Sequence, residues 1–509
     1  MRAWLFSLAG MDEEQCLSKE TKVQTSSQCG IPKSTVGELM SVEDPKNWPL
    51  SKKVYINTVL MMIVFLQTYA SGVYSPGISA MLRDINMSKE LAHLGTGIYM
   101  FGISVGSLLW GPMSQTVGRR PVFIVSLLGT ILFSVGASLS MHAAGIIICR
   151  FFAGTMGATA FSNVAGSIVD MTTERERNPY NTMFRFFTFM GPAVAATVGA
   201  VVVHDSNWHW NLRSLPVAAF ACLVLYTWTV PETYLPILIE QQIETEIENV
   251  EEQLHHHSWF HRKVSHIYHH LPGLKLVKLL LWRVIVSLPV PWILLIEEPL
   301  IMVITFYTSL LYGLLYGFLL IFPQVWGTVR GFSPVQVGYT YFAVMAGFCL
   351  STAFVSLWIQ NTEYRRAFDM NKHSPELRIR SGLFSTFLVP IGLFLFGWTA
   401  PFPHVHWIVP CIGAMCFSMG MLCVFSSWMA YMTDTYSNNT AAVIAMNSFV
   451  RCGLAGAFPL FTEQMVTGMT LQGAMTLFGG ISIPLSGAGL VIAFYGNRIR
   501  EKSRHAVYG

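Results

Sequence analysis

Long apolar runs separated by short polar segments make up most of the chain. A helix that crosses about 30 Å of hydrocarbon needs roughly 20 apolar residues, and the runs have about this length. They predict six spans in the first half, at 53–75, 92–113, 121–140, 143–167, 182–203 and 214–230. Six more follow a long polar gap, at 299–323, 337–360, 382–400, 406–432, 441–466 and 472–496. We therefore expect an all-α membrane protein with twelve transmembrane helices in two six-helix halves.

One segment, 276–296, allows two interpretations. It is apolar, but Lys278 and Arg283 interrupt it and two prolines break it. We interpret it as an interfacial or in-plane segment that leads into the seventh span; a thirteenth span, which would invert the second half, is the alternative. The first interpretation divides the chain into an N-terminal tail (1–52), a first half (53–230), a central loop (231–298), a second half (299–496) and a C-terminal tail (497–509).

The distribution of basic residues predicts which way the chain is inserted. Lys and Arg concentrate in cytoplasmic loops near the helix ends. With the N-terminus inside, the outer loops hold only Arg83, Lys89, Arg213 and Arg330, whereas the inner loops and tail hold Arg119, Arg120, Arg175, Arg177, Arg365, Arg366, Lys372, Arg378, Arg380, Arg498, Arg500, Lys502 and Arg504. The excess of Lys and Arg stays on the inner side in both halves only if segment 276–296 does not cross the membrane. We expect both termini and the central loop in the cytoplasm, and the protein in the plasma membrane or, alternatively, the vacuolar membrane.

Composition excludes several classes of function. Charged residues are 12% of the chain, against about 25% in a typical soluble domain, and mean hydropathy is +0.48. The net charge of +4 and the lack of a long basic block argue against nucleic acid as a partner. No phosphate-binding GxxxxGK[ST] loop, HExxH, GxSxG or paired-cysteine motif occurs. We therefore expect neither an enzyme nor a bound cofactor or metal.

The central loop contains the main soluble features. Its start has apolar residues at helical spacing among glutamates, from Ile243 to Leu254, which predicts a short amphipathic helix. A histidine-rich stretch follows at 255–270. We interpret that stretch as a solvated basic face near anionic lipid headgroups, with metal binding as the less favoured alternative.

The polar segment after the second span contains a candidate conformational latch. It runs from Gly111 to Gly118, followed by Arg119 and Arg120, and predicts a tight turn that presents two guanidinium groups at the start of the next helix. Asp170, at the foot of the fourth span, is a plausible partner for them. Simple anchoring of the loop to the membrane surface is the alternative.

This segment resembles the signature of the major facilitator superfamily, and the resemblance extends over nearly the whole chain. Further segments resemble the fungal drug:proton antiporters of that superfamily: Asp44–Pro49, Cys149–Ala158, Asp170 with Glu176 and Arg177, Gly191 with Pro192, Tyr431–Tyr436 and Arg451–Phe461. Gln115 departs from the pattern, because the family usually has a carboxylate there. Ala195 and Ala196 likewise follow the Gly191-Pro192 helix-packing motif where paired glycines are usual.

The resemblance implies a secondary transporter with a solute path between two halves. It implies proton-coupled efflux of a drug, a toxin or a fungal secondary metabolite by alternating access, with the Arg119–Asp170 latch stabilising the outward-open state. Small-molecule substrate, protons and the lipid bilayer would be the partners of a monomer. Proton-coupled uptake of a small organic solute, polyamine export, a membrane-embedded enzyme and a non-transporting sensor are the alternatives. The scarcity of acids in the spans argues against a polycation.

A few charged residues inside the spans are candidates for coupling transport to protons. A charge at the bilayer centre costs roughly 2.5–3.5 kcal/mol even on permissive scales, so it should face the protein interior or a watered cavity. We assign Arg150 to the cavity or to proton coupling; a structural role, donating to backbone carbonyls, is the alternative, and for Arg451 the two are equally supported. Glu298 and Glu463 are candidate proton carriers that could also be ordinary interfacial residues.

An aromatic face in the seventh span is a candidate wall of the substrate cavity, and plain packing against lipid is the equally supported alternative. Tyr312 and Tyr316 are four residues apart and share one side of the helix, and aromatic pockets suit amphipathic organic solutes. Gln67, Asn163 and Asn447 could contact substrate or form interhelical hydrogen bonds. Asn86, in the first outer loop, begins a glycosylation sequon, although its closeness to the membrane argues against modification.

Overall fold

The computed structural model describes residues 44–85, 87–173, 176–242, 289–354, 375–436, 440–500 and 503. The first half contains η1 (Pro45–Asn47), α4 (Leu50–Gly72), η2 (Ser75–Gly77), α5 (Ile78–Asp84), α6 (Lys89–Val117), α7 (Arg119–Leu139), α8 (Ala143–Gly157), α9 (Thr159–Met171), α10 (Arg177–Asp205) and α11 (Trp208–Thr229). The second half contains α15 (Pro289–Glu297), α16 (Pro299–Phe322), η4 (Pro323–Val329), α17 (Pro334–Thr352), α19 (Glu376–Thr399), α20 (Ile408–Thr435) and α21 (Thr440–Arg500).

The described helices account for the twelve predicted spans. Ten helical segments are long and apolar enough to cross a membrane, and one of them, Ala442–Gly496, has 55 residues. Thr470 interrupts this segment with non-helical dihedral angles (φ 65°, ψ 163°), so α21 holds two crossings. The 19-residue α17 supplies the remaining one, while α8 and α9 together form the fourth. The predicted all-α membrane fold is thus confirmed.

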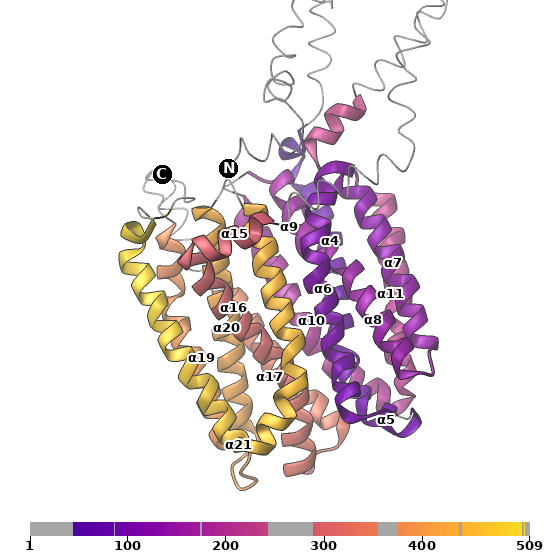
Figure 1. Ribbon diagram of the computed structural model, residues 1–509, viewed down its shortest axis with the longest axis vertical. Helices are drawn as coiled ribbons and strands as arrows, with labels where there is room; N and C mark the ends of the chain where they lie inside the picture. The colour runs from indigo at the N-terminus through magenta and orange to yellow at the C-terminus, as the bar shows by residue number, and fades with distance from the viewer. Residues whose placement is uncertain are drawn as a thin grey trace, which may run out of the picture.

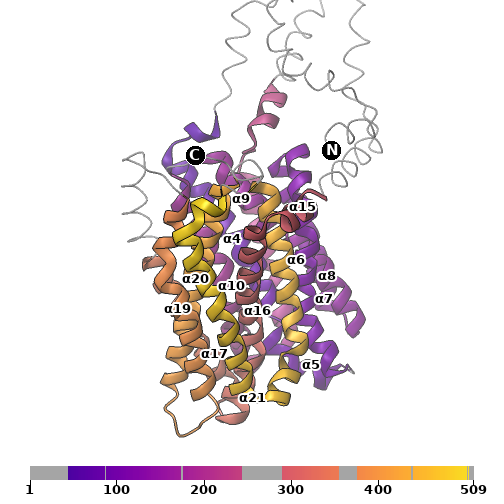
Figure 2. The same cartoon turned by 60° about the vertical axis from the view of Figure 1, so that its left-hand side comes forward.

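The two halves stand side by side as separate helix bundles (Figures 1 and 2). Indigo to magenta helices form one bundle and red to yellow helices form the other, with η1 and the C-terminal end of α21 at the same end of the molecule (Figure 1). We call this the terminal end, and the end that carries α5 the far end. The nine-residue α15 lies at the terminal end. Glu298 alone separates it from α16, and residues 276–288 of the ambiguous segment lie outside the described part of the chain.

Close backbone contacts join the halves at the far end. Gly97 in α6 lies against Gly456 in α21, where a Cβ atom at Gly97 would overlap the Gly456 carbonyl oxygen. The Thr197 hydroxyl of α10 donates to the Gly338 carbonyl of α17 at 3.0 Å. Small residues allow such approaches between helices in membranes. The far end of the interface is therefore closed by direct packing of α6 on α21 and of α10 on α17.

Helix α6 extends further than the sequence indicates. The segment from Gly111 was predicted to be a turn, but α6 continues through Pro112 to Val117, and Gly118 alone separates it from α7. Gly118 has φ +104°, a conformation that side chains disfavour. One residue thus provides the whole turn. The central-loop helix at 243–254, the histidines at 255–270 and Asn86 lie outside the described residues.

Candidate functional site

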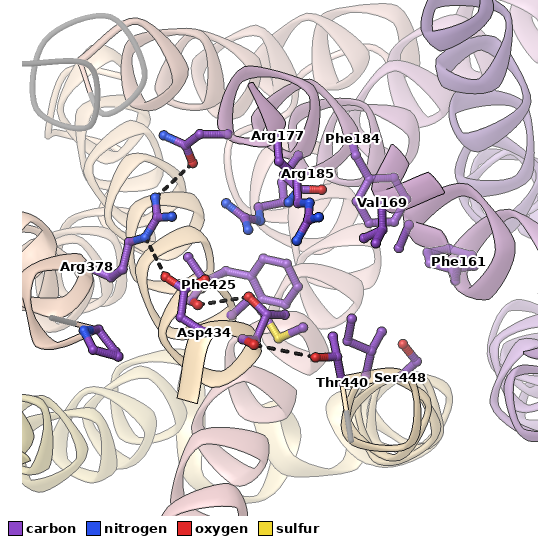
Figure 3. A pocket seen from close by; sticks show the side chains of 18 of the residues that line it. Phe161, Val169, Arg177, Phe184, Arg185, Arg378, Phe425, Asp434, Thr440 and Ser448 are labelled. Carbon is purple, nitrogen blue, oxygen red and sulfur yellow. Dashed lines mark hydrogen bonds and ion pairs between the residues drawn. The ribbon is translucent and has the colours of Figure 1, made fainter. Parts of the chain in front are cut away.

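A cavity of about 570 Å³ lies between the two halves, toward the terminal end. Helices α9 and α10 line it from the first half, and α20 and α21 line it from the second (Figure 3). Phe161, Phe184, Phe425 and Met429 give it an apolar wall. Its positive groups are Arg177, Arg185, Arg378, Arg451 and Arg500, and Asp434 with five uncharged polar side chains completes the polar part of the wall. An apolar cavity with a few convergent polar groups is the usual form of a small-molecule site.

The side chain of Arg378 joins the two halves at the cavity wall. The Arg378 Nε atom donates to Asp434 Oδ2 at 3.0 Å, and its Nη1 atom donates to Asn178 Oδ1 at 3.1 Å (Figure 3). Asp434 lies in the last turn of α20 in the second half, whereas Asn178 lies in the first turn of α10 in the first. Arg378 therefore links the halves at the terminal end through a single side chain, in contrast to the continuous packing at the far end.

Arg451 contributes a buried cation to this cavity. Only 3% of the residue is exposed, and its guanidinium lies 4.6 Å from the ring centroid of Tyr312 and 5.0 Å from that of Phe425. Its Nε and Nη1 atoms have no hydrogen-bond partner among the described residues. Ring faces attract a cation, but they do not satisfy its N–H groups. Of the two roles considered for Arg451, the geometry favours the cavity.

Arg150 lies elsewhere, within the first half. Its Nε atom donates to the Gly95 carbonyl at 2.7 Å, and its Nη2 atom to the carbonyls of Ala70 and Ser71, both at 3.4 Å. The rings of Tyr74 and Tyr99 enclose it at 4.6 and 5.2 Å. It does not line the cavity. This geometry fits the structural alternative, because the guanidinium ties α8 to α4 and α6.

The predicted cavity residues lie in the packed interior rather than on the cavity wall. Tyr312 and Tyr316 are fully buried. The ring of Tyr312 contacts the guanidinium of Arg451. The Tyr316 hydroxyl forms a hydrogen bond of 2.6 Å with the Ser71 hydroxyl of the first half. Two of the three amides form interhelical contacts instead, and Asn163 bonds within its own helix. Gln67 accepts from Tyr99 at 2.7 Å, and Asn447 donates to Thr308 at 3.0 Å. Asn163 accepts from its neighbour Ser162 at 3.3 Å.

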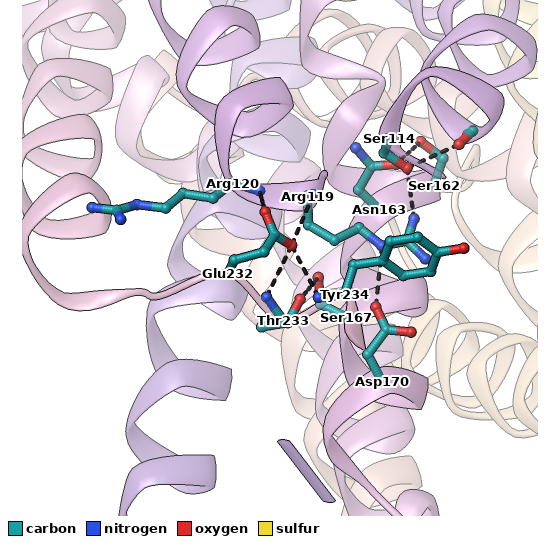
Figure 4. A network of polar contacts seen from close by, with 11 residues as sticks. Ser114, Arg119, Arg120, Ser162, Asn163, Ser167, Asp170, Glu232, Thr233 and Tyr234 are labelled. Atoms are coloured by element: carbon teal, nitrogen blue, oxygen red, sulfur yellow. Dashed lines mark hydrogen bonds and ion pairs between the residues drawn. The ribbon is translucent and has the colours of Figure 1, made fainter. Parts of the chain in front are cut away.

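The expected partnership of Arg119 and Asp170 is present (Figure 4). Arg119 Nε donates to Asp170 Oδ2 at 3.1 Å, with both residues in the first half. The sequence analysis overlooked Glu232, whose carboxylate accepts from the backbone N–H groups of Arg119 at 3.0 Å and Arg120 at 2.9 Å. A carboxylate at the start of α7 also meets the positive end of the helix dipole. The latch is formed while the far end is closed, so its presence alone does not distinguish an outward-open state.

The remaining predicted residues pack helices, line the cavity or form polar contacts near the terminal end, three of them in the first half and Glu298 in the second. Gly191 and Pro192 pack α10 against α4, because a Cβ atom at Gly191 would overlap the Thr68 hydroxyl. Before α10, the Lys53 ammonium donates to Glu176 Oε2 at 3.0 Å, and this bond holds the pKa of Glu176 below its usual value. Arg177, the next residue, lines the cavity. Glu298 is buried at the start of α16 and accepts from the Tyr436 hydroxyl at 3.0 Å.

Glu463 lies at the closed far end, in contact with a residue that the sequence analysis overlooked. Its Oε2 atom is 2.7 Å from His93 Nε2, which joins α21 to α6 across the interface. His93 is 370 positions away in the chain, so no local pattern could have paired them. Arg185 was also overlooked, although the rule applied to Arg150 would have found it, because it is a charged residue inside the predicted span 182–203.

Comparisons with known proteins agree with this geometry. The chain matches the Major Facilitator Superfamily over residues 60–460. It is 32% identical over 454 residues to the efflux pump FUBT of Fusarium oxysporum, covering 86% of this chain and 72% of that protein. It is 28% identical over 456 residues to the probable drug/proton antiporter YHK8 of Saccharomyces cerevisiae, covering 90% and 86%.

Solved structures share the fold. The structure of the proton:xylose symporter XylE bound to 6-bromo-6-deoxy-D-glucose superimposes with a TM-score of 0.62 at 14% identity, covering 88% of this chain and 96% of that one. A peptide transporter POT in complex with sulfate gives a TM-score of 0.60, covering 87% and 95%. With the family match over most of the sequence, the chain belongs to the major facilitator superfamily, whose members are membrane transporters rather than enzymes.

Proposed function

We propose that this transporter exports an amphipathic small molecule in exchange for protons. The cavity between the halves supports the proposal most directly, because it is large enough for a drug-sized solute and combines an apolar wall with a few charged groups. The names of its relatives, which include efflux pumps and a probable drug/proton antiporter, point in the same direction.

Transport would proceed by alternating access, with the halves rocking around the cavity. The terminal end is joined across the halves by Arg378 and Asn178, whereas the far end is closed by backbone packing. The bias of basic residues toward one side supports a cytoplasmic terminal end. On this assignment the structure is an inward-facing conformation of a plasma-membrane monomer.

The His93–Glu463 pair is the candidate for proton coupling. It joins two titratable groups across the interface at 2.7 Å, and opening the far end must separate α6 from α21 and break it. A group that interacts differently in two conformations biases the equilibrium between them when its charge changes. Binding of a proton to this pair is therefore linked to opening of the far end.

Vesicle transport tests the direction and the coupling. Inside-out vesicles with an acidic lumen should accumulate labelled amphipathic compounds from a screening panel, and a protonophore should stop the accumulation. Glu463→Gln should reduce the pH-driven component at least tenfold, because its carboxylate can no longer change charge. Glu240→Gln, on an exposed residue of the central loop, is the matched control. Loss of preloaded compound with the protons would instead identify an uptake symporter.

A further inference from the structure

We propose that the substrate class is an organic anion, whose carboxylate or sulfonate group pairs with Arg451 and whose apolar body packs on the cavity phenylalanines. Arg185 supplies the second cation. The inference rests on the proposed function of the cavity as the transport site and names the chemistry of its cargo.

The charges of the cavity wall favour an anion. Five arginines and one acid, Asp434, line it. Asp434 already bonds to Arg378 at 3.0 Å, and Arg500 lies 3.6 Å from Glu376. No ion pair to Arg185 or Arg451 occurs within the described ranges. A cationic solute would therefore meet an excess of like charge, whereas an anion would neutralise it.

The orientation of Arg451 supports the same conclusion. Two of its guanidinium nitrogens, Nε and Nη1, lack an acceptor in the described part of the chain. The residue is 3% exposed, so bulk water does not compensate them. The N–H groups of Nε and Nη1 point to different sides of the guanidinium, and each can donate a charge-assisted hydrogen bond to an oxygen of an anion. The missing acceptor is therefore one that a bound anion would supply.

Arg185 repeats this arrangement on the other half. It is 5% exposed and its Nη1 atom has no acceptor in the described residues. Figure 3 shows its side chain extending into the space between α10 and α20, on the same side as Arg177. Because Arg185 belongs to α10 and Arg451 to α21, an anion in the cavity would face a buried cation on each half of the transporter.

The aromatic residues of the cavity wall favour an apolar, aromatic body in the bound anion. Phe425 and Phe161 hold Arg451 at 5.0 and 5.7 Å from their ring centroids, and both line the cavity together with Phe184. Their remaining faces can stack on an aromatic ring of the solute. An aromatic acid combines the two features that the wall recognises, a planar apolar body and one delocalised negative charge.

Binding to the purified full-length chain in detergent tests the assignment without requiring transport. The probes are 2-naphthoate, 2-naphthalenesulfonate, neutral 2-naphthamide and cationic 2-naphthylmethylammonium, with affinity measured by ligand-induced thermal stabilisation. Both anions should bind at least tenfold more tightly than the amide, and the ammonium more weakly still. Equal binding of all four, preference for the cation, or no binding of either anion would overturn the proposal.

Variants localise the effect. Arg451→Gln and Arg185→Gln should each weaken anion binding at least tenfold and leave amide binding unchanged, while Arg451→Lys should recover part of the loss. Arg213→Gln, an exposed arginine of α11 outside the cavity, is the control. Unchanged anion affinity in both glutamine variants would contradict the assignment. If protons drive the export of cations alone, the substrate is not an anion, although the proposed function holds. If anions bind selectively but are not exported, only the proposed function is refuted.

Discussion

Replacing Gly97 with alanine is expected to reduce transport at least tenfold while leaving the chain in the membrane. A Cβ atom at this position would overlap the backbone carbonyl of Gly456, and a carbonyl in the middle of α21 cannot move aside as a side chain would. Helices α6 and α21 would have to separate at the far end. The conformation with a closed far end would lose its closing contact, and the population would shift toward conformations that are open at the far end.

Two measurements check this expectation. Transport into inside-out vesicles gives the loss of rate, and labelling of a Thr433→Cys cavity residue with a membrane-impermeant thiol reagent reports access from the terminal end. Both should fall together in Gly97→Ala. Gly453→Ala is the matched control, because its Cβ atom would meet only the Ser104 hydroxyl at 3.4 Å. Normal transport and labelling in Gly97→Ala would show that this contact does not close the far end.

Replacing Arg150 with methionine should cause a comparable loss of transport together with a lower melting temperature. The guanidinium donates to carbonyls of both α4 and α6, and a hydrogen bond to a charged group contributes about 1.5–3 kcal/mol. Methionine keeps much of the apolar stem but leaves these carbonyls without the donor. Packing of α8 against α4 and α6 would loosen, and the first half would no longer move as a rigid unit.

The melting temperature and the pH profile distinguish this structural role from proton coupling. Arg150→Lys retains a cation and should recover part of the stability, whereas Arg213→Met, on an exposed residue, should change neither quantity. A coupling role predicts a different result: an Arg150→Met protein of unchanged melting temperature whose transport no longer responds to the pH gradient.

The spans could be predicted because a bilayer imposes one length on every apolar helix. The Arg119–Asp170 contact could also be predicted, since both residues lie close to helix ends on the same side. The cavity wall could not. A sequence shows which residues share a helix face, as with Tyr312 and Tyr316, but not how that helix is rotated against its neighbours. Both tyrosines therefore proved to be buried behind the wall.

Contacts between distant segments were beyond the sequence for the same reason. Glu463 was a candidate without a partner until the structure placed His93 beside it. Glu232 follows the last helix of the first half, where an acidic residue in a loop attracts no notice, yet it accepts from the backbone N–H groups that begin α7. Only the turn at Gly118 brings those groups to it.

A reversible disulfide at the far end tests alternating access most directly. A Cβ atom at Gly338 would lie 3.0 Å from the Ala200 Cβ atom, so a shift of a few tenths of an ångström between α10 and α17 gives the separation of about 3.5–4.5 Å that a disulfide requires. Oxidation of an Ala200→Cys, Gly338→Cys protein should therefore lock the far end and stop transport, and a reducing agent should restore the rate that the protein had before oxidation, while the rate of each single variant should respond to neither reagent. If the double variant transports as fast after the disulfide has formed as it does with free thiols, the far end need not open during transport, and alternating access as described here is contradicted.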